Sequence, residues 1–174
     1  MSKCIYLIGS LRNPGIPALA NVIQRETGHE AFASWFSPGP QADDYWRDYT
    51  KDRGWSYREA LTEHAATHIY SFDKQHIDRA DAAVLVAPAG KSGHLELGYM
   101  IGQGKPCFYL LEPENERYDV MLQFCFENGG SVCSTMDELI VELKKLEEVK
   151  NATCDKEVGS SCTVEPKGYT YTKT

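Results

Sequence analysis

A glutamate follows directly on an apolar segment and stands among glycines. In the stretch PAGKSGHLELGYMIGQGKP, Glu96 lies between Gly93 and Gly98, where a strand has ended and a helix is expected to begin. The helix dipole stabilises the ionised form of an acidic side chain in the first turn. An ionised carboxylate at the mouth of a pocket is suited to act as a nucleophile, although first-turn acids often only complement the dipole.

Cleavage of a glycosidic bond through a covalent intermediate needs a second carboxyl, which protonates the leaving group. Asp81 begins the strand expected at 81–88 and therefore lies at the opposite edge of the sheet, and Asp78 lies within the preceding helical segment. Asp73 opens that segment. Because the helix runs antiparallel to the strand that it precedes, we expect Asp73 at the carboxyl edge, near Glu96. Asp73 is the predicted acid.

The loop after the first expected strand, GSLRNPG, carries polar groups at the same edge. It offers a hydroxyl, a guanidinium and backbone N–H groups at a helix N-terminus, which together suit a phosphate. The alternative is a plain turn with a solvated arginine. The candidate substrate-binding residues of this loop are Gly9, Ser10, Arg12 and Asn13.

Three further side chains are expected near Glu96. Ser92 and His94 precede it in the same stretch and are candidates for substrate contacts. Tyr6, in the first strand, can hydrogen-bond a carboxylate from the loop of the neighbouring strand. The alternative for Tyr6 is an ordinary core tyrosine with a satisfied hydroxyl.

The segment 37–56 is dense in proline, glycine and aspartate, which indicates an ordered excursion rather than a regular element. It also holds Trp46 and Trp55, more large aromatic surface than a disordered linker carries. We expect the aromatic-rich stretch from Trp35 to Tyr57, with these two side chains, to cover a nucleobase by stacking.

Short apolar runs alternate with segments of helical periodicity along the chain. Such unpatterned strands indicate a parallel sheet covered on both faces, hence a doubly wound α/β fold of five strands. We expect one such domain over 1–149 and a polar tail over 150–174. The expected strands are 3–9, 29–36, 81–88, 106–112 and 131–134, and the expected helices are 16–28, 94–104, 118–129 and 136–150. The stretch 57–72 begins helically, and 73–80 is expected to add another turn or two before the third strand.

Composition limits the class of protein. The 174 residues, 42% of them hydrophobic, suffice for one domain with a real core. No apolar run reaches the roughly 18 residues of a membrane span, and the start of the chain lacks a signal-peptide pattern, so we expect a cytoplasmic protein. A net charge of −7 argues against a nucleic acid polymer and favours a small ligand. The cysteines show no zinc spacing, and we expect neither a metal nor an organic cofactor.

Three longer stretches combine these residues. They are IYLIGS near the start, DKQHIDRADAAVLVAP with Asp73 eight residues before Asp81, and GKSGHLELGYMIGQGKPCFYLL, which is the most specific. Together they resemble the nucleoside 2-deoxyribosyltransferase family, including its relatives that hydrolyse 2'-deoxynucleoside 5'-monophosphates. The resemblance covers roughly residues 3 to 147. It implies a flavodoxin-like sheet, no cofactor, and homodimers or larger homo-oligomers that share active sites.

The resemblance also implies a role for each matching residue. Glu96 matches the nucleophile that attacks C1' of the sugar, and Asp73 matches the carboxyl that protonates the departing base. Tyr6 matches the tyrosine that orients the nucleophile. Ser10 and Arg12 match residues that contact the 5'-phosphate in the hydrolases. The implied substrates are a nucleoside or nucleotide and a free nucleobase, within nucleotide metabolism and salvage.

Two positions depart from the family pattern. Gly90 stands where the transferases carry an aspartate and the hydrolases a serine, and Ser92 or Lys91 is the expected substitute. His94 stands where both groups have glycine, and we expect it to narrow the sugar site.

These residues leave several functions open. We favour transfer of the sugar to a second base, and hydrolysis with water as acceptor is the alternative within the same chemistry. A module that binds or sequesters nucleotides without turnover is an alternative of another class, motivated by Gly90 and His94. A flavodoxin-like electron carrier would need a hydroxyl-rich phosphate loop, whereas GSLRNPG has one serine.

Overall fold

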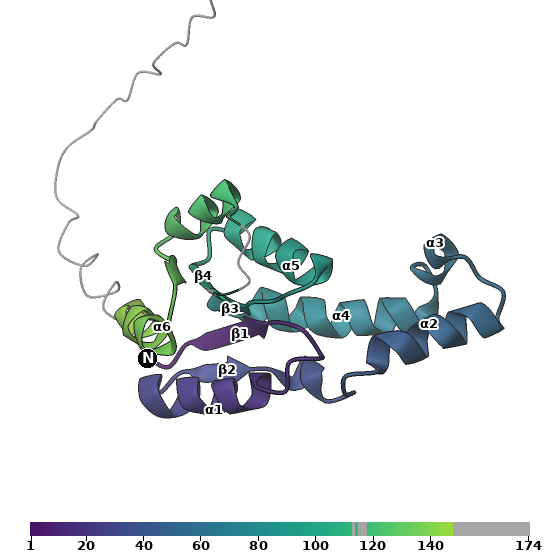
Figure 1. Ribbon diagram of the computed structural model, residues 1–174, viewed down its shortest axis with the longest axis horizontal. Coiled ribbons are helices and arrows are strands. Elements are labelled where there is room, and N and C mark those ends of the chain that lie inside the picture. Colours follow the sequence, from purple (N-terminus) through teal and green to yellow (C-terminus); the bar gives the residue numbers. More distant parts are fainter. Residues whose placement is uncertain (113, 115–117, 148–174) are drawn as a thin grey trace, which may run out of the picture.

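The computed structural model describes residues 1–112, 114 and 118–147 (Figure 1). All strand pairs in its five-stranded sheet are parallel, in the order β2-β1-β3-β4-β5. The predicted doubly wound, flavodoxin-like α/β fold is therefore confirmed. The strands are β1 (Cys4–Ile8), β2 (Glu30–Phe32), β3 (Ala82–Val86), β4 (Cys107–Leu110) and β5 (Ser131–Cys133). The helices are α1 (Ile16–Thr27), α2 (Ala42–Asp52), α3 (Tyr57–Ala60), α4 (His64–Arg79), α5 (Lys91–Gly102) and α6 (Met136–Lys144), and the 3-10 helices are η1 (Ser34–Phe36), η2 (Val120–Phe126) and η3 (Lys145–Glu147).

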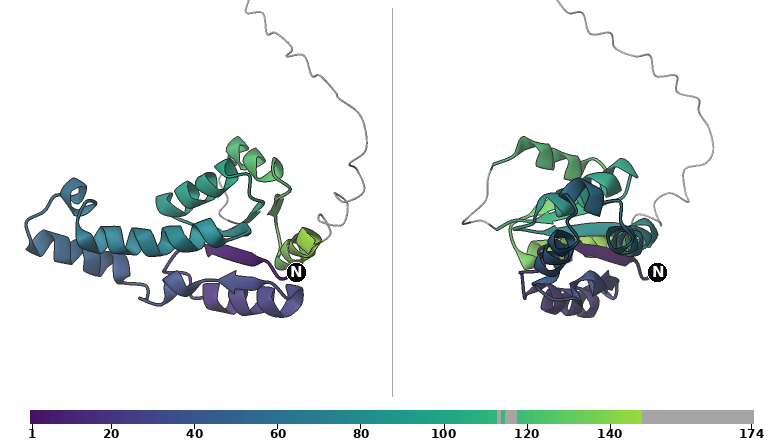
Figure 2. Two further views of the ribbon diagram at one scale, coloured as in Figure 1. Left: turned by 180° about the vertical axis from the view of Figure 1, so that it is seen from behind. Right: turned by 90° about the vertical axis from the view of Figure 1, so that its right-hand side faces the viewer.

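Helices cover both faces of the sheet, because alternate side chains of a buried strand point to opposite faces. Along β1, Ile5 and Leu7 pack in one cluster with α1 and α6. Tyr6 and Ile8 pack in the other cluster with α4, α5 and η2. Figures 1 and 2 show α1 and α5 on opposite sides of the sheet. Tyr6, Asp73 and Glu96, described below, lie on the α4 and α5 side.

Two expected elements have a different form. The second strand ends at Phe32, and the 3-10 helix η1 follows where the strand was expected to continue. A physical reason is visible at Trp35, whose indole N–H donates a hydrogen bond of 2.7 Å to the carbonyl of Leu7 and so holds the chain across the end of β1. The helix expected at 118–129 is the 3-10 helix η2.

The prediction of an irregular excursion over 37–56 was wrong, because α2 is a regular α-helix within it. Asp43 and Asp44 lie in the first turn of α2, where acidic side chains complement the helix dipole. In Figures 1 and 2, α2, α3 and the beginning of α4 form an arm that projects past the carboxyl edge of the sheet. Because α4 already begins in this arm, at His64, Asp73 lies in the middle of the helix rather than at its beginning.

The polar tail predicted over 150–174 lies outside the described residues. Within the described part of the chain, none of the helices combines the length and the apolar character that a membrane crossing requires.

Candidate active site

Glu96 is carried by α5, whose first turn packs closely against the end of β1. A Cβ atom at Gly93 would lie 2.9 Å from Ile8 Cγ2 and 3.3 Å from Ala89 Cβ, so a glycine is needed for this approach. The helix begins at Lys91, earlier than expected, and Glu96 lies in its second turn. The prediction of a first-turn position was therefore wrong, and the helix dipole stabilises an ionised Glu96 less than expected.

Three predicted site residues influence one another electrostatically. Burial, followed by the charge of Asp73, raises the pKa of the Glu96 carboxyl to about 7. Burial also raises the pKa of Asp73. Burial, then Glu96 and then Asp73, raises the pKa of the Tyr6 hydroxyl. The structure thus brings α4, α5 and β1 together so that two carboxyls and a phenol share one region.

The two carboxyls have no cation or hydrogen-bond donor to compensate them within the part of the chain that the structure describes. Neither Asp73 nor Glu96 is in an ion pair, and neither side chain accepts a hydrogen bond there. Both residues are half-buried, yet no fully buried side-chain oxygen or nitrogen among the described residues lacks a partner. Their unpaired oxygens therefore keep some contact with solvent.

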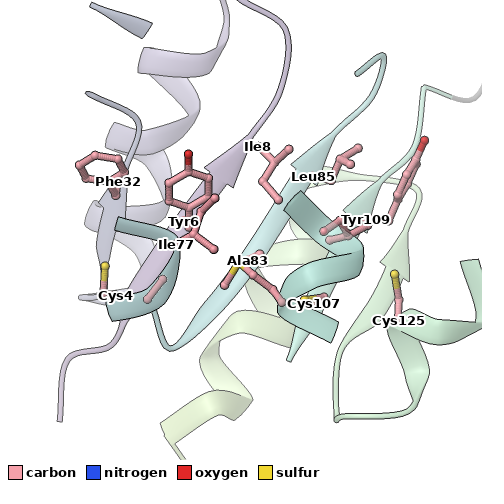
Figure 3. Packing of buried hydrophobic residues seen from close by; sticks show 13 residues of the cluster. Cys4, Tyr6, Ile8, Phe32, Ile77, Ala83, Leu85, Cys107, Tyr109 and Cys125 are labelled. Atoms are coloured by element: carbon pink, nitrogen blue, oxygen red, sulfur yellow. The ribbon is translucent and has the colours of Figure 1, made fainter. Parts of the chain in front are cut away.

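Tyr6 is almost fully buried, and its ring stacks on Phe32 at 5.6 Å between centroids. Figure 3 shows the hydroxyl of Tyr6 directed toward the Ile8 end of the strand, the end at which α5 begins. Among the described residues this hydroxyl makes no hydrogen bond, so its predicted bond to Glu96 stays a prediction. Phe32 also stacks on His76 of α4, at 3.9 Å, which fixes α4 beside β1.

The loop after β1 is arranged largely by its own hydrogen bonds. The backbone N–H of Arg12 donates to Ser10 Oγ at 3.2 Å, and the backbone N–H of Gly15 donates to Asn13 Oδ1 at 2.9 Å. The guanidinium of Arg12 pairs with Asp44 of α2 at 3.3 Å. Arg12 is exposed, so it is accessible to a ligand, but a phosphate there must compete with Asp44.

Gly9 has a packing role in the same loop. A Cβ atom at Gly9 would lie only 2.7 Å from Ile16 Cδ1 and 3.8 Å from Trp35 Cη2. Trp35 is therefore the tryptophan that lies at the carboxyl edge of β1. The sequence placed Trp35 at the start of the aromatic stretch expected to cover a base, but its bond to Leu7 joins two distant segments and could not be predicted.

Ser92 and His94 lie on different sides of α5, and only Ser92 lies on the side of Glu96. Ser92 is exposed in the first turn. His94 Nδ1–H donates to the Gly90 carbonyl at 2.9 Å, and its ring lies 6.2 Å from that of Tyr109. Two residues correspond to about 200° around a helix, so His94 and Glu96 point to nearly opposite sides.

His94 instead lines a cleft of about 490 Å³ between α5 and η2. Leu97, Gly98 and Ile101 line it from the same face of α5. The proposed narrowing of a sugar site at Glu96 by His94 remains untested, and the described geometry directs the imidazole away from that site.

Trp46 and Trp55 belong to the arm. The ring of Trp46 lies 6.0 Å from Tyr57, and that of Trp55 lies 6.1 Å from Tyr49. Their described ring contacts are thus with other residues of the arm, together with Arg53 above Trp55. Stacking of these two tryptophans on a base stays a prediction.

The described residues contain no group of three or more His, Cys, Asp or Glu side chains placed to hold a metal ion. The site thus consists of two uncompensated carboxyls, a buried tyrosine and a polar loop at the carboxyl edge of β1 and β3. When the chain is compared with models of protein families and with curated proteins, neither comparison finds a match.

Proposed function

We propose that this protein cleaves the N-glycosidic bond of 2'-deoxynucleosides or their 5'-monophosphates and transfers the sugar to a second base. The observation that carries this proposal is the pair Asp73 and Glu96: both are half-buried, both have raised pKa values, and neither forms an ion pair with a cation among the described residues. Burial of two carboxyls without a compensating partner costs folding free energy. Such an arrangement is typical of a catalytic site.

The pair suits a two-step reaction at C1' of the sugar. The Glu96 carboxylate attacks C1', the C1'–N bond breaks, and its electron pair leaves with the base as Asp73 donates a proton to that base. A nitrogen of the second base then attacks C1', the ester bond to Glu96 breaks, and Asp73 takes the proton back. Each step inverts C1', so the overall reaction retains its configuration.

The productive state carries one proton on the pair. Two nearby carboxyls lose their protons in two coupled steps, and the singly protonated pair predominates between them. In this state the proton moves between Glu96 and Asp73, and the form with the proton on Asp73 reacts. The raised pKa of Glu96 supports the proposal, because it keeps that proton on the pair up to near neutral pH.

Three other features support a nucleotide as substrate. Trp35 offers an aromatic surface beside Gly9, at the edge where a base would lie. Ser10 keeps its own O–H free to donate, since its oxygen accepts from the backbone of Arg12. Arg12 would exchange Asp44 for a 5'-phosphate, because the doubly charged group is the stronger acceptor.

We also propose a homo-oligomer. Large apolar side chains are exposed on α4 and on α5, next to the carboxyl pair, and a second copy of the chain would cover them and exclude water from the site. They are Ile69, Tyr70, Phe72, Leu95 and Tyr99. A monomeric mass by light scattering would contradict this proposal.

Chromatography of reaction mixtures tests the function. Wild type and Glu96→Gln are incubated with deoxynucleosides and deoxynucleoside monophosphates, each with and without a second free base, and Glu26→Gln serves as an exposed glutamate control. New nucleoside that forms only with acceptor, in wild type and Glu26→Gln, is the expected result. Free base released without acceptor would assign water as the acceptor. If nothing is consumed while a nucleotide raises the melting temperature of wild type and Glu96→Gln alike, the protein is a binding module and the proposal fails.

A further inference from the structure

One polar network joins α4 to α5 immediately beside the carboxyl pair. Tyr99 Oη donates to Asp78 Oδ1 at 3.0 Å, and Gln103 Nε2 donates to the same oxygen at 3.3 Å and to Tyr99 Oη at 2.8 Å. Lys74 Nζ donates to the other oxygen, Asp78 Oδ2, at 2.5 Å. The ammonium also lies 4.6 Å from the centroid of the Tyr99 ring. Lys74 is thus held on two sides by Asp78 and Tyr99.

The members of this network are direct neighbours of the proposed catalytic residues. Lys74 follows Asp73 in the chain, and Tyr99 lies one turn after Glu96 on α5. Residues three apart on a helix share a face, so Tyr99 and Glu96 both face α4. A lysine side chain on four methylene groups is flexible, so its ammonium can take other positions once Asp78 and Tyr99 no longer hold it.

Two other cations near the end of α4 are already engaged. Lys105 Nζ donates to the carbonyls of Ile77 and Asp78, at 3.0 and 2.9 Å, where α4 ends. Arg79 of α4 pairs with Glu30 of β2 at 2.6 Å. The electrostatic neighbours of Asp73 and Glu96 that the described residues show are each other and Tyr6 on β1. The other ionisable groups on this part of α4 and just after α5 are Lys74, His76, Asp78 and Lys105. His76 stacks on Phe32 and accepts a hydrogen bond from Arg79 Nε at 2.9 Å.

We propose that Asp78 and Tyr99 are positioning residues that sequester Lys74, and so keep its positive charge away from Asp73 and Glu96. This inference rests on the proposed function, because it explains how the pair retains the proton that the leaving base needs. An ammonium close to a carboxyl favours the ionised form and lowers its pKa by about 1 to 3 units. With Lys74 at the pair, both carboxyls would be ionised at neutral pH, and no acid would remain to protonate the base.

The geometry also explains why Lys74 needs two partners. Asp78 satisfies its charge with an ion pair across one helical turn, from i to i+4. Tyr99 adds the face of its ring and fixes the Asp78 carboxylate through its hydroxyl. Because the Lys74–Asp78 ion pair is partly exposed to solvent, either partner alone would let the ammonium exchange between positions.

The test measures the protonation of Glu96 directly, without turnover. The full chain is labelled with ¹³C in the glutamate side chains, and the Glu96 carboxyl resonance, assigned by its loss in Glu96→Gln, is followed from pH 4 to pH 9. In Asp78→Asn the released Lys74 should lower the apparent pKa of Glu96 by about one unit. Tyr99→Phe, which keeps the ring but loses the bond to Asp78, should lower it by less.

The double variant Lys74→Met with Asp78→Asn is the decisive control. It lacks the Asp78 charge as the single variant does, so a return of the Glu96 pKa toward the wild-type value assigns the effect to Lys74. The inference is overturned if Asp78→Asn leaves the titration of Glu96 unchanged, or if the double variant keeps the lowered pKa. If Asp78→Asn does not fold, Tyr99→Phe decides by the same criterion, with Lys74→Met added to it as the control.

Failure of the proposed function would give a different result from failure of this inference. Wild type would then release no base from any substrate, while the titration of Glu96 would still respond to Asp78→Asn in the expected direction. If the protein is active, the alkaline limb of the pH–rate profile should shift to lower pH in Asp78→Asn and return in the double variant. A purely structural role for Asp78 would lower the melting temperature without moving that limb.

Discussion

Asp73 on α4 raises the pKa of Glu96 on α5, although no helix or strand contains both residues. Burial contributes more than the charge of Asp73, and both effects favour the protonated form of Glu96. The relationship exists because α4 and α5 both pack on the face of the sheet that holds Tyr6. It should make the stability of this protein, and the proposed activity, depend on pH in defined ways.

Glu96→Gln should increase stability above neutral pH. The unfolded chain loses the Glu96 proton near the ordinary value of 4.5, and the folded chain loses it near 7. Between these values the folded state binds more protons, so the free energy of unfolding falls as the pH rises. Because Glu96 is half-buried, we expect the variant to gain on the order of 2 kcal/mol at pH 8 and almost nothing at pH 4.

Urea unfolding of wild type and Glu96→Gln at a series of pH values measures this difference. Glu26→Gln, at an exposed position on α1, should show no such pH-dependent gain. A constant difference between pH 4 and pH 8 would contradict a raised pKa at Glu96.

The pH dependence of kcat/KM should be bell-shaped, with its alkaline limb near the pKa of about 7 assigned to Glu96. The rate should rise with pH as the doubly protonated pair loses its first proton, at a value above the ordinary aspartate pKa of 3.8. It should fall as the second proton leaves, because Asp73 can then no longer protonate the base.

Asp73→Asn should change this profile in two respects. The rate should fall about 100-fold or more, since the general acid is lost. The alkaline limb should disappear, because no carboxyl remains at position 73 whose loss of a proton could remove the acid, and the residual rate should rise to a plateau as Glu96 ionises. An alkaline limb that persists unchanged in Asp73→Asn would assign it to another group.

Gly93→Ala should separate α5 from β1 and impair both stability and activity. The added methyl group would lie 2.9 Å from Ile8 Cγ2, on a β-branched side chain with little freedom to move. We expect a loss of about 1 to 3 kcal/mol in the free energy of unfolding, measured by urea denaturation, and a lower kcat/KM.

Gly98→Ala is the matched control on the same helix. A Cβ atom there meets no other atom within 4 Å, so the substitution should stabilise α5 by up to about 1 kcal/mol. Equal effects of the two substitutions would contradict the close approach of Gly93 to β1.

Arg12→Met should distinguish phosphorylated from unphosphorylated substrates. If Arg12 exchanges Asp44 for a 5'-phosphate, the KM for a deoxynucleoside monophosphate should rise about 10-fold or more, and the KM for the deoxynucleoside should stay the same. Steady-state kinetics with both substrates measures this. Arg25→Met, which removes an exposed arginine at the other end of α1, should affect neither, and equal KM values for the monophosphate in Arg12→Met and wild type would remove Arg12 from the site.

Local patterns in the sequence were sufficient for the layout of the fold. Buried parallel strands are apolar without alternation, and helices repeat at a different period, so β1, β3 and β4 could be recognised one at a time. The carboxyl edge of the sheet followed from the strand directions, and with it the expected nearness of Asp73 to Glu96. The regular helix α2 was missed because proline and glycine at its flanks masked its periodicity.

Other features depend on segments that are distant in the chain, and only the tertiary structure decided them. Trp35 reaches the edge of β1 through a bond to Leu7, and His94 turns to Tyr109 rather than to the side of Glu96. The protonation of Glu96 also depends on distant segments, because a pKa depends on how much water remains around the group and on charges from other helices and strands. The sequence by itself determined that the carboxyls of Asp73 and Glu96 lie along one edge of the sheet. The packing of α4 on α5 decided that this pair lies half-buried, without a compensating cation among the described residues.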